Sequence, residues 1–268
     1  YFSSNRKGSL FYSDEGCCND IYSFDILQDT LKYYIDTLLT IPQEQIVENI
    51  QTILPIDLYF HNDEPNPKSM DTTTNIDYKT SLLAYTSMKE LYQQEYSKGL
   101  KDKEKIKAKE DIENFFIEKL EEGLLLLDQV KQWILVDLQR GNDVEITITG
   151  FASPLFSDKY NENLSMRRII SFENYIALQK EFTPYLDDTT SGNKLKFIAI
   201  PKGKSTAAKH ISDNVNDKRN SVFSISAALE RRIQLSKYES KPHLNNSNKG
   251  SIMLLASKNI NIKNQKNV

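Results

Sequence analysis

The side chains with the strongest intrinsic chemistry are scattered along this chain of 268 residues. It has three histidines, His61, His210 and His243, and two pairs of acids that could be offered as a catalytic pair, Asp187 with Asp188 and Asp213 with Asp217. The histidines have neither the spacing of metal ligands nor that of a base beside a nucleophile. The acid pairs lie in stretches rich in Gly, Ser, Thr and Asn, which are typical of exposed loops. No G-x-S-x-G, H-E-x-x-H or P-loop pattern occurs. We therefore expect a protein that is not an enzyme, with no catalytic residue, no metal and no cofactor.

The two cysteines, Cys17 and Cys18, are adjacent. Neighbouring side chains of an extended chain point to opposite faces, so a disulfide between them would be strained. They also lack the C-x-x-C spacing of metal or redox pairs. Two interpretations stay open. One is a small apolar pair that packs a turn between strands, and the other is one disulfide to a cysteine upstream of Tyr1 in an oxidising compartment.

The composition narrows the class of partner. Basic and acidic residues nearly balance to a net charge of −3 and are interspersed, so we expect no nucleic-acid partner. Hydrophobic residues make up 39% of the chain, and no apolar run approaches the ~18 residues of a membrane-spanning helix. We expect no transmembrane segment. The first residue is Tyr1 rather than Met, and we expect a leader and upstream domains to precede it.

The hydrophobic periodicity predicts four strands and several helices around one core. Each strand alternates apolar and polar residues, and the four are 54–60, 143–150, 195–201 and 231–238. Helical spacing fills 75–139 and 160–178, and a short helix is predicted at 43–50. Such a set makes an α+β fold, in which a mixed sheet is covered on one face by helices.

The helical stretch has two contrasting parts. The lysine- and glutamate-rich run from Lys98 to Glu113 is typical of a solvated helical face. The following segment, 115–138, carries Trp133 and the four leucines 124–127, which we expect in the core. We expect this helix to be the most buried in the chain.

Both ends of the chain differ from this core. Residues 1–27 contain two short strand patterns, which cannot form a stable unit alone, and 28–53 is expected to be a linker that includes the short helix. The stretch 240–268 is rich in Asn, Lys and Ser and is expected to be a tail. Its one apolar segment, 252–256, is predicted to dock as a strand or to pack on the domain.

Two runs of residues resemble the signature of the OmpA, MotB and Pal family. The signature G-x-x-D, then Y-N-x-x-L-S-x-x-R, is similar to Gly150-Phe151-Ala152-Ser153 followed by Tyr160-Asn161-Glu162-Asn163-Leu164-Ser165-Met166-Arg167-Arg168, with the spacing kept. The family's last strand, D-R-R-V-E-I, resembles Glu230-Arg231-Arg232-Ile233-Gln234-Leu235. The resemblance covers 54–239 and implies an OmpA-like mixed sheet, with a helical insertion at about 75–113.

The start of the chain resembles a second family. Phe2-Ser3-Ser4-Asn5-Arg6 with Gly8, and Asp20-Ile21-Tyr22 with Phe24, are similar to elements of the WD40-like propeller repeats that precede OmpA-like domains in envelope proteins of Bacteroidota. Residues 1–27 would then be the end of an incomplete propeller blade.

The OmpA-like resemblance implies non-covalent binding of peptidoglycan through the diaminopimelate side chain of its stem peptides. In the family an aspartate meets the ammonium group, and an arginine holds the carboxylate through two parallel charge-assisted hydrogen bonds. Arg168 stands at the arginine position and Asn161 at the asparagine position, whereas Ser153 replaces the aspartate. Losing a charged hydrogen-bond partner costs about 1.5–3 kcal/mol, so either binding is weakened or another acid substitutes.

Candidates for a substitute acid follow the first predicted strand. Asp63 and Glu64, beside Asn62, lie just beyond that strand, whose end borders the ligand pocket in the OmpA-like fold. The alternative is a loop carboxylate in water, because the flanking prolines favour a polar turn. Asn161 likewise has an alternative role as the N-cap of a helix. Six predicted ligand-binding residues are expected to converge at one edge of the sheet, and they are Arg168, Asn161, Ser153, Asp63, Asn62 and Glu64.

Two functions remain open. In the first, the domain binds peptidoglycan and tethers an outer-membrane-associated protein or complex to the cell wall. In the second, it is a degenerate OmpA-like scaffold that docks partner proteins in an outer-membrane machine such as type IX secretion or barrel assembly. Both imply a periplasmic protein associated with the outer membrane, as a lipoprotein if a lipid anchor lies on an upstream part.

Overall fold

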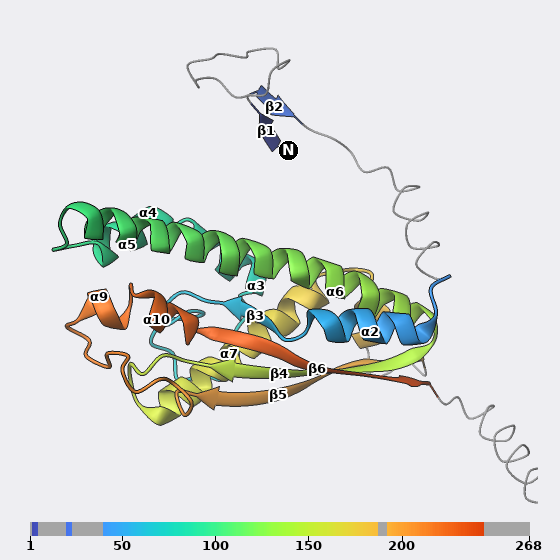
Figure 1. The fold of residues 1–268 in the computed structure, drawn as a ribbon. Helices are drawn as coiled ribbons and strands as arrows, with labels where there is room; N and C mark the ends of the chain where they lie inside the picture. Colours follow the sequence, from blue (N-terminus) through green and yellow to red (C-terminus); the bar gives the residue numbers. More distant parts are fainter. Residues whose placement is uncertain (1, 5–19, 23–39, 187–191, 244–268) are drawn as a thin grey trace, which may run out of the picture. The chain divides into compact units, whose positions relative to one another are not determined.

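Figure 1 shows the computed structural model of the chain, which describes residues 2–4, 20–22, 40–186 and 192–243. The chain divides into two compact units, which are Tyr1–Ile41 and Pro42–Val268. In the first unit, β1 (Phe2–Ser4) pairs antiparallel with β2 (Asp20–Tyr22). Predictions that fall outside the described residues concern Cys17, Cys18, Asp187, Asp188 and the segment 252–256.

The second unit contains a mixed sheet of four strands, each at a predicted place. They are β3 (Ile56–Tyr59), β4 (Asn142–Phe151), β5 (Leu195–Gly203) and β6 (Arg232–Pro242). In space they follow the order β3-β6-β4-β5. The strand β6 runs antiparallel to both β3 and β4, whereas β4 and β5 are parallel. The α+β class with a mixed sheet is therefore confirmed.

One face of the sheet forms the core. Along β4 the residues Val144, Ile146 and Ile148 are buried and their neighbours are half-buried, as expected when alternate side chains point to opposite faces. On β5 the Phe197 ring meets Phe172 of the helix α7 at 5.8 Å between ring centres. The alternation predicted from the sequence thus separates a helix-covered face from a more polar one.

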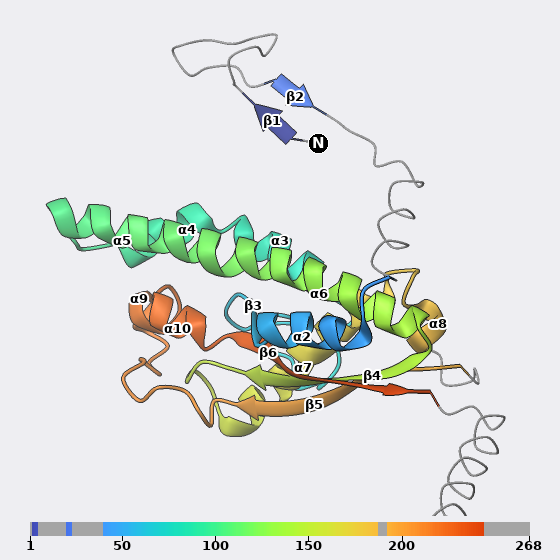
Figure 2. The ribbon, with the colours of Figure 1, turned by 45° about the vertical axis from the view of Figure 1, so that its right-hand side comes forward.

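Helices occupy the stretches between these strands. They are α2 (Gln43–Ile53), α3 (Tyr78–Thr86), α4 (Lys89–Tyr96), α5 (Asp102–Phe115), the π-helix η1 (Phe116–Glu121), α6 (Glu122–Gln139), α7 (Asp158–Ala177), α8 (Thr183–Leu186), α9 (Lys218–Ser221) and α10 (Ile225–Leu229). The segments α5, η1 and α6 form one long helical run, with α3 and α4 beside it (Figure 2). Most of α5 is exposed, as its charge pattern predicted.

The expectation that 115–138 is the most buried helix was wrong. Leu125 is 65% exposed and Leu126 is also exposed, while Trp133 is only half-buried. The most buried helix is α7, which packs against β4, β5 and β6 and is covered by the loop after β3. Four leucines in a row cover all sides of a helix, so they cannot all face one core.

The short helix α2, predicted as part of a linker, belongs to the core of the second unit. Its Ile46 and Ile50 are fully buried, and it packs on α6 and β6. The fully buried carboxylate of Asp137 on α6 accepts a hydrogen bond from Gln43 Nε2 at 2.5 Å and from the hydroxyl of Tyr238 on β6. A buried carboxylate needs such donors, and here they join three elements.

Two glycines allow α7 to lie directly on the strand ends. A Cβ at Gly150 would stand 2.5 Å from the carbonyl oxygen of Ser165, and one at Gly203 would stand 2.9 Å from the amide nitrogen of Glu162. Gly203 also has a positive φ of 56°, which glycine adopts without strain. Any larger residue at Gly150 would force the helix and the strand apart.

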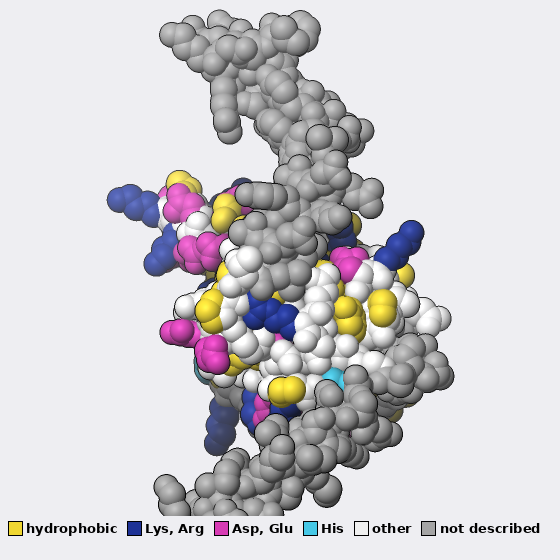
Figure 3. Space-filling view, turned by 90° about the vertical axis from the view of Figure 1, so that its right-hand side faces the viewer, with side chains coloured by type: hydrophobic (Ala, Val, Ile, Leu, Met, Phe, Trp, Pro, Cys, Tyr) yellow, Lys and Arg dark blue, Asp and Glu magenta, His cyan; other side chains and the backbone are white. Residues whose placement is uncertain are grey.

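The surface agrees with the mixed charge of the sequence. On the face drawn in Figure 3, basic, acidic and hydrophobic side chains are interspersed. Among the described residues, none of the helices combines the length and the apolar character needed to cross a membrane.

Candidate functional site

The loop that follows β3 lies over α7, so segments far apart in the sequence meet at one edge of the sheet. Asn163 Nδ2 donates to the carbonyl oxygen of Met70 at 2.6 Å, and Asn174 Nδ2 donates to that of Thr74 at 2.7 Å. Backbone carbonyl groups of a loop need donors when they are buried. Side chains of α7 supply them, and the loop is held along much of its length.

Arg168 is the centre of this arrangement and is fully buried. Its Nε donates to the carbonyl oxygen of Glu64 at 3.0 Å, Nη1 to that of Phe151 at 2.7 Å, and Nη2 to that of His61 at 3.3 Å. The guanidinium carbon lies 5.5 Å from the centre of the Phe60 ring. Every nitrogen of the guanidinium therefore donates to the backbone, and the side chain ties the loop after β3 to the end of β4.

Arg167, which the sequence did not single out, has a parallel role. It is fully buried, its Nε donates to the carbonyl oxygen of Pro65 at 3.0 Å, and its Nη1 donates to those of Ser69 and Asp71 at 2.8 and 2.7 Å. Adjacent arginines on a helix face different directions, so both hold the same loop at successive points. The only feature of the sequence that could have pointed to Arg167 is its place next to Arg168.

The acids predicted to replace the missing aspartate lie in this loop. Asp63 is buried and accepts hydrogen bonds from the hydroxyl of Tyr160 and, at 3.1 Å, from the amide of Lys68. Glu64 is half-buried, and burial and then the charge of Asp63 raise its pKa. Asn62 is half-buried in the same turn. The loop residues therefore reach Arg168 as predicted, but the carboxylate of Asp63 already has two donors.

Ser153 lies on the connection from β4 to α7, and Asn161 lies in the first turn of α7. Both are buried, and Asn161 Nδ2 donates to the carbonyl oxygen of Leu155 at 2.5 Å. The N-cap of α7 is Ser157, whose Oγ accepts from the amide of Tyr160 at 3.3 Å, so the N-cap role considered for Asn161 was wrong. Asn161 shapes the loop from inside the first turn of the helix.

The site is electrostatically positive inside. Burial and then the nearby Arg231 lower the pKa of Arg168 to about 9, although Asp63 opposes this. Burial, followed by the charges of Arg231 and Arg168, lowers the pKa of His61 to about 3. His61 Nδ1 lies 2.8 Å from the hydroxyl oxygen of Tyr92. The imidazole is therefore neutral at physiological pH.

Arg231 is a second residue that sequence reasoning did not single out as part of the site. It is fully buried, and its Nη2 donates to the carbonyl oxygen of Val222 at 2.7 Å and to the hydroxyl of Tyr92 at 3.2 Å. Its Nε and Nη1 have no hydrogen-bond partner among the described residues. A buried guanidinium with so few partners is costly, and its charge is the second cause, after burial, of the lowered pKa values of Arg168 and His61.

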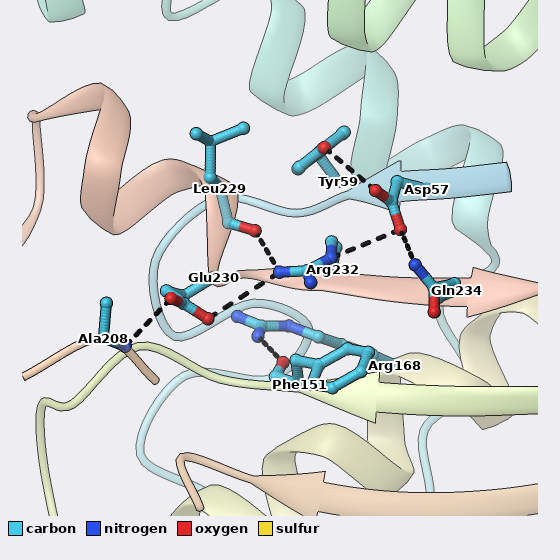
Figure 4. A network of polar contacts seen from close by, with 9 residues as sticks. All are labelled: Asp57, Tyr59, Phe151, Arg168, Ala208, Leu229, Glu230, Arg232 and Gln234. Atoms are coloured by element: carbon cyan, nitrogen blue, oxygen red, sulfur yellow. Dashed lines mark hydrogen bonds and ion pairs between the residues drawn. The ribbon is translucent and has the colours of Figure 1, made fainter. Parts of the chain in front are cut away.

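The next residue, Arg232, points to the other face of the sheet (Figure 4). Its Nε lies 3.2 Å from the carboxylate of Asp57, and its Nη1 lies 3.7 Å from that of Glu230. The guanidinium carbon lies 4.5 Å from the centre of the Phe151 ring. Arg168 holds the carbonyl group of the same Phe151 (Figure 4), so both arginines fix the end of β4, one from each side.

Among the described residues, no three His, Cys, Asp or Glu side chains gather closely enough to hold a metal ion. Asp217, one of the acids considered as a catalytic pair, accepts hydrogen bonds from the side-chain amide of Asn220 at 3.0 and 3.1 Å, a local structural role.

Comparisons of the chain with protein-family models, with curated proteins and with solved structures found no match.

Proposed function

We propose that residues 42–243 form an OmpA-like scaffold of the periplasm, associated with the outer membrane, that docks partner proteins of an outer-membrane machine. This is the second of the two functions suggested by the sequence. The single observation that carries this proposal is the burial of Arg168 and its hydrogen bonds to the backbone. In the family that the sequence resembles, wall binding depends on this arginine.

Three of the five N–H groups of Arg168 already donate to the backbone, and the whole side chain is out of reach of solvent. The side chain is fully buried, and each of its three nitrogens donates to a backbone carbonyl group. A stem-peptide carboxylate would have to reach a fully buried guanidinium, and each backbone carbonyl group that it displaced would be buried without a donor at a cost of about 1–3 kcal/mol. The position that would meet the ammonium group holds Ser153, a neutral residue. Both halves of a zwitterion site are therefore weakened.

The helices from α3 to α6 support docking. Large hydrophobic side chains are exposed along α3, α4, α5, η1 and α6, and they are Leu83, Leu91, Ile106, Ile117, Leu125 and Leu126. Exposed apolar residues gathered on a set of neighbouring helices are typical of surfaces that bind another protein.

We predict that the wild-type chain stays in the supernatant when it is centrifuged with sacculi whose peptidoglycan contains diaminopimelate. Arg168→Lys and the matched control Arg167→Lys should behave in the same way, because neither arginine meets the wall. Sedimentation of the wild type that is lost in Arg168→Lys but kept in Arg167→Lys would contradict the scaffold and establish wall binding.

We further predict that a photo-crosslinking amino acid at Leu125 forms a covalent adduct with an envelope protein in intact cells. The control position is Lys103, which is also exposed but lies in the charged part of α5. Mass spectrometry of the adduct identifies the partner. Equal yields at both positions, or no adduct at Leu125, would count against docking through the apolar side chains of the helices from α3 to α6.

Peptidoglycan binding is the second candidate, and one observation favours it. The charge of Asp63 raises the pKa of Arg168, against the effect of burial, which supports an acid near the arginine as the compensating-acid hypothesis requires. In that case Ser153→Asp should increase the fraction of protein that sediments with sacculi, by restoring a partner for the ammonium group. No change in Ser153→Asp would favour the scaffold.

A further inference from the structure

A groove separate from the Arg168 site lies beside the first turn of α7. Its volume is about 730 Å³, which falls in the range of pockets for small molecules. It is formed by the β4–α7 loop, the start of α7, the end of β5 and the loop that follows β5. Arg168 and the loop after β3 do not line it.

The topology places this groove where anions commonly bind. The strands β4 and β5 are parallel and α7 connects them, so both strands end at the groove together with the start of a helix of 20 residues. Crevices outside the carboxyl ends of parallel strands are typical ligand sites. The unpaired amides and the dipole at a helix N-terminus favour negative charge there.

Two of the four lysines that line the groove make no ion pair with the described residues, so their ammonium groups could bind an anion. Lys159 pairs with Glu162 at 2.8 Å, and Lys204 pairs with Asp158 at 3.2 Å. Lys202 and Lys209 also line the groove and are exposed, and neither makes a hydrogen bond or ion pair with any described residue through its side chain. Three acids also line the groove. Asp158 and Glu162 are the partners of Lys204 and Lys159, and the third acid is Asp213.

The walls of the groove are held in place. The ammonium group of Lys204 donates to the carbonyl oxygen of Phe156 at 2.7 Å, which fixes the β4–α7 loop. On the opposite wall, the amide of Ala208 donates to the carboxylate of Glu230 at 3.1 Å (Figure 4). Lys209 follows directly, so its backbone starts from a fixed point. A site with fixed walls loses less entropy when a ligand binds.

We propose that this groove binds a small molecule through a phosphate group, held between Lys202, Lys209 and the first amides of α7. The groove is larger than a phosphate ion, so the rest of the ligand would lie along Pro154, Pro201 and Ile211, which line it. This proposal does not depend on the scaffold function, because no residue of the Arg168 site takes part.

The test is a titration of the chain with inorganic pyrophosphate, followed by the amide signals of Lys159, Ala207 and Lys209 in NMR spectra. We expect saturable shifts at these amides and a Kd that rises at least tenfold in the double variant Lys202→Ala, Lys209→Ala. The matched control, Lys103→Ala with Lys107→Ala on α5, removes two exposed lysines elsewhere and should bind like the wild type.

Three outcomes would overturn the proposal. They are shifts that never saturate, an equal loss of affinity in both double variants, and binding only to vesicles of phosphatidylglycerol with none to pyrophosphate. The last outcome would assign the lysines to a membrane surface. Sedimentation with sacculi does not report on this groove, so a failure here is distinguishable from a failure of the proposed function.

Discussion

Replacing Arg168 by alanine is expected to lower the free energy of unfolding by about 4 kcal/mol, because each buried carbonyl group left without a donor costs about 1–3 kcal/mol. The carbonyl groups of His61, Glu64 and Phe151 would lose their donors, and the guanidinium would leave a cavity. Burial and Arg231 already disfavour the charge of Arg168, so the loss comes from the orphaned carbonyl groups rather than from a lost ion pair. Denaturant unfolding followed by circular dichroism measures it.

The matched control is Arg232→Ala on the opposite face of the sheet. Its ion pair with Asp57 is partly exposed, so we expect a loss of about 1 kcal/mol. If the free energy of unfolding fell no more in Arg168→Ala than in Arg232→Ala, the guanidinium of Arg168 would not hold the loop after β3 in place. It would then be free to receive a ligand carboxylate.

Acid is expected to destabilise the fold through His61, by up to about 4 kcal/mol between pH 6.5 and pH 3. The folded-state pKa of about 3 lies below the ordinary value of 6.5, so the unfolded chain takes up a proton first as the pH falls. The stability from the neutral imidazole is complete above pH 6.5 and is lost towards pH 3. Glu64 acts in the opposite direction, since its raised pKa favours the fold as its carboxyl becomes protonated.

The difference between the wild type and His61→Gln isolates this effect. Glutamine retains a polar group near Tyr92 but does not titrate, so the slope of stability against pH between 6.5 and 3 should be shallower in the variant by about 1 kcal/mol per pH unit. Parallel curves for the two proteins, or an NMR titration of His61 near pH 6.5, would mean that the imidazole is hydrated and that Arg231 does not act on it.

The local pattern of the sequence determined the elements. The strands 54–60, 143–150, 195–201 and 231–238 and the helix 160–178 all occur close to their predicted bounds, because periods of 2.0 and 3.6 residues follow directly from which side chains face a core. The same pattern did not determine the exposure of Leu125, because a run of leucines has no period. It also did not show that α2 packs into the domain, since burial depends on what covers a face.

At the candidate site, the resemblance predicted that the loop after β3 lies near Arg168, and the tertiary structure decided which groups the arginine contacts. The spacing from Gly150 to Arg168 resembled a ligand-binding signature, and the loop after β3 does reach Arg168. A guanidinium binds whichever acceptors surround it, and here these are backbone carbonyl groups from distant parts of the chain. Carbonyl groups are the same in every residue, so no sequence motif marks them. Whether Arg168 holds a ligand or the loop is therefore fixed only by the path of the folded backbone.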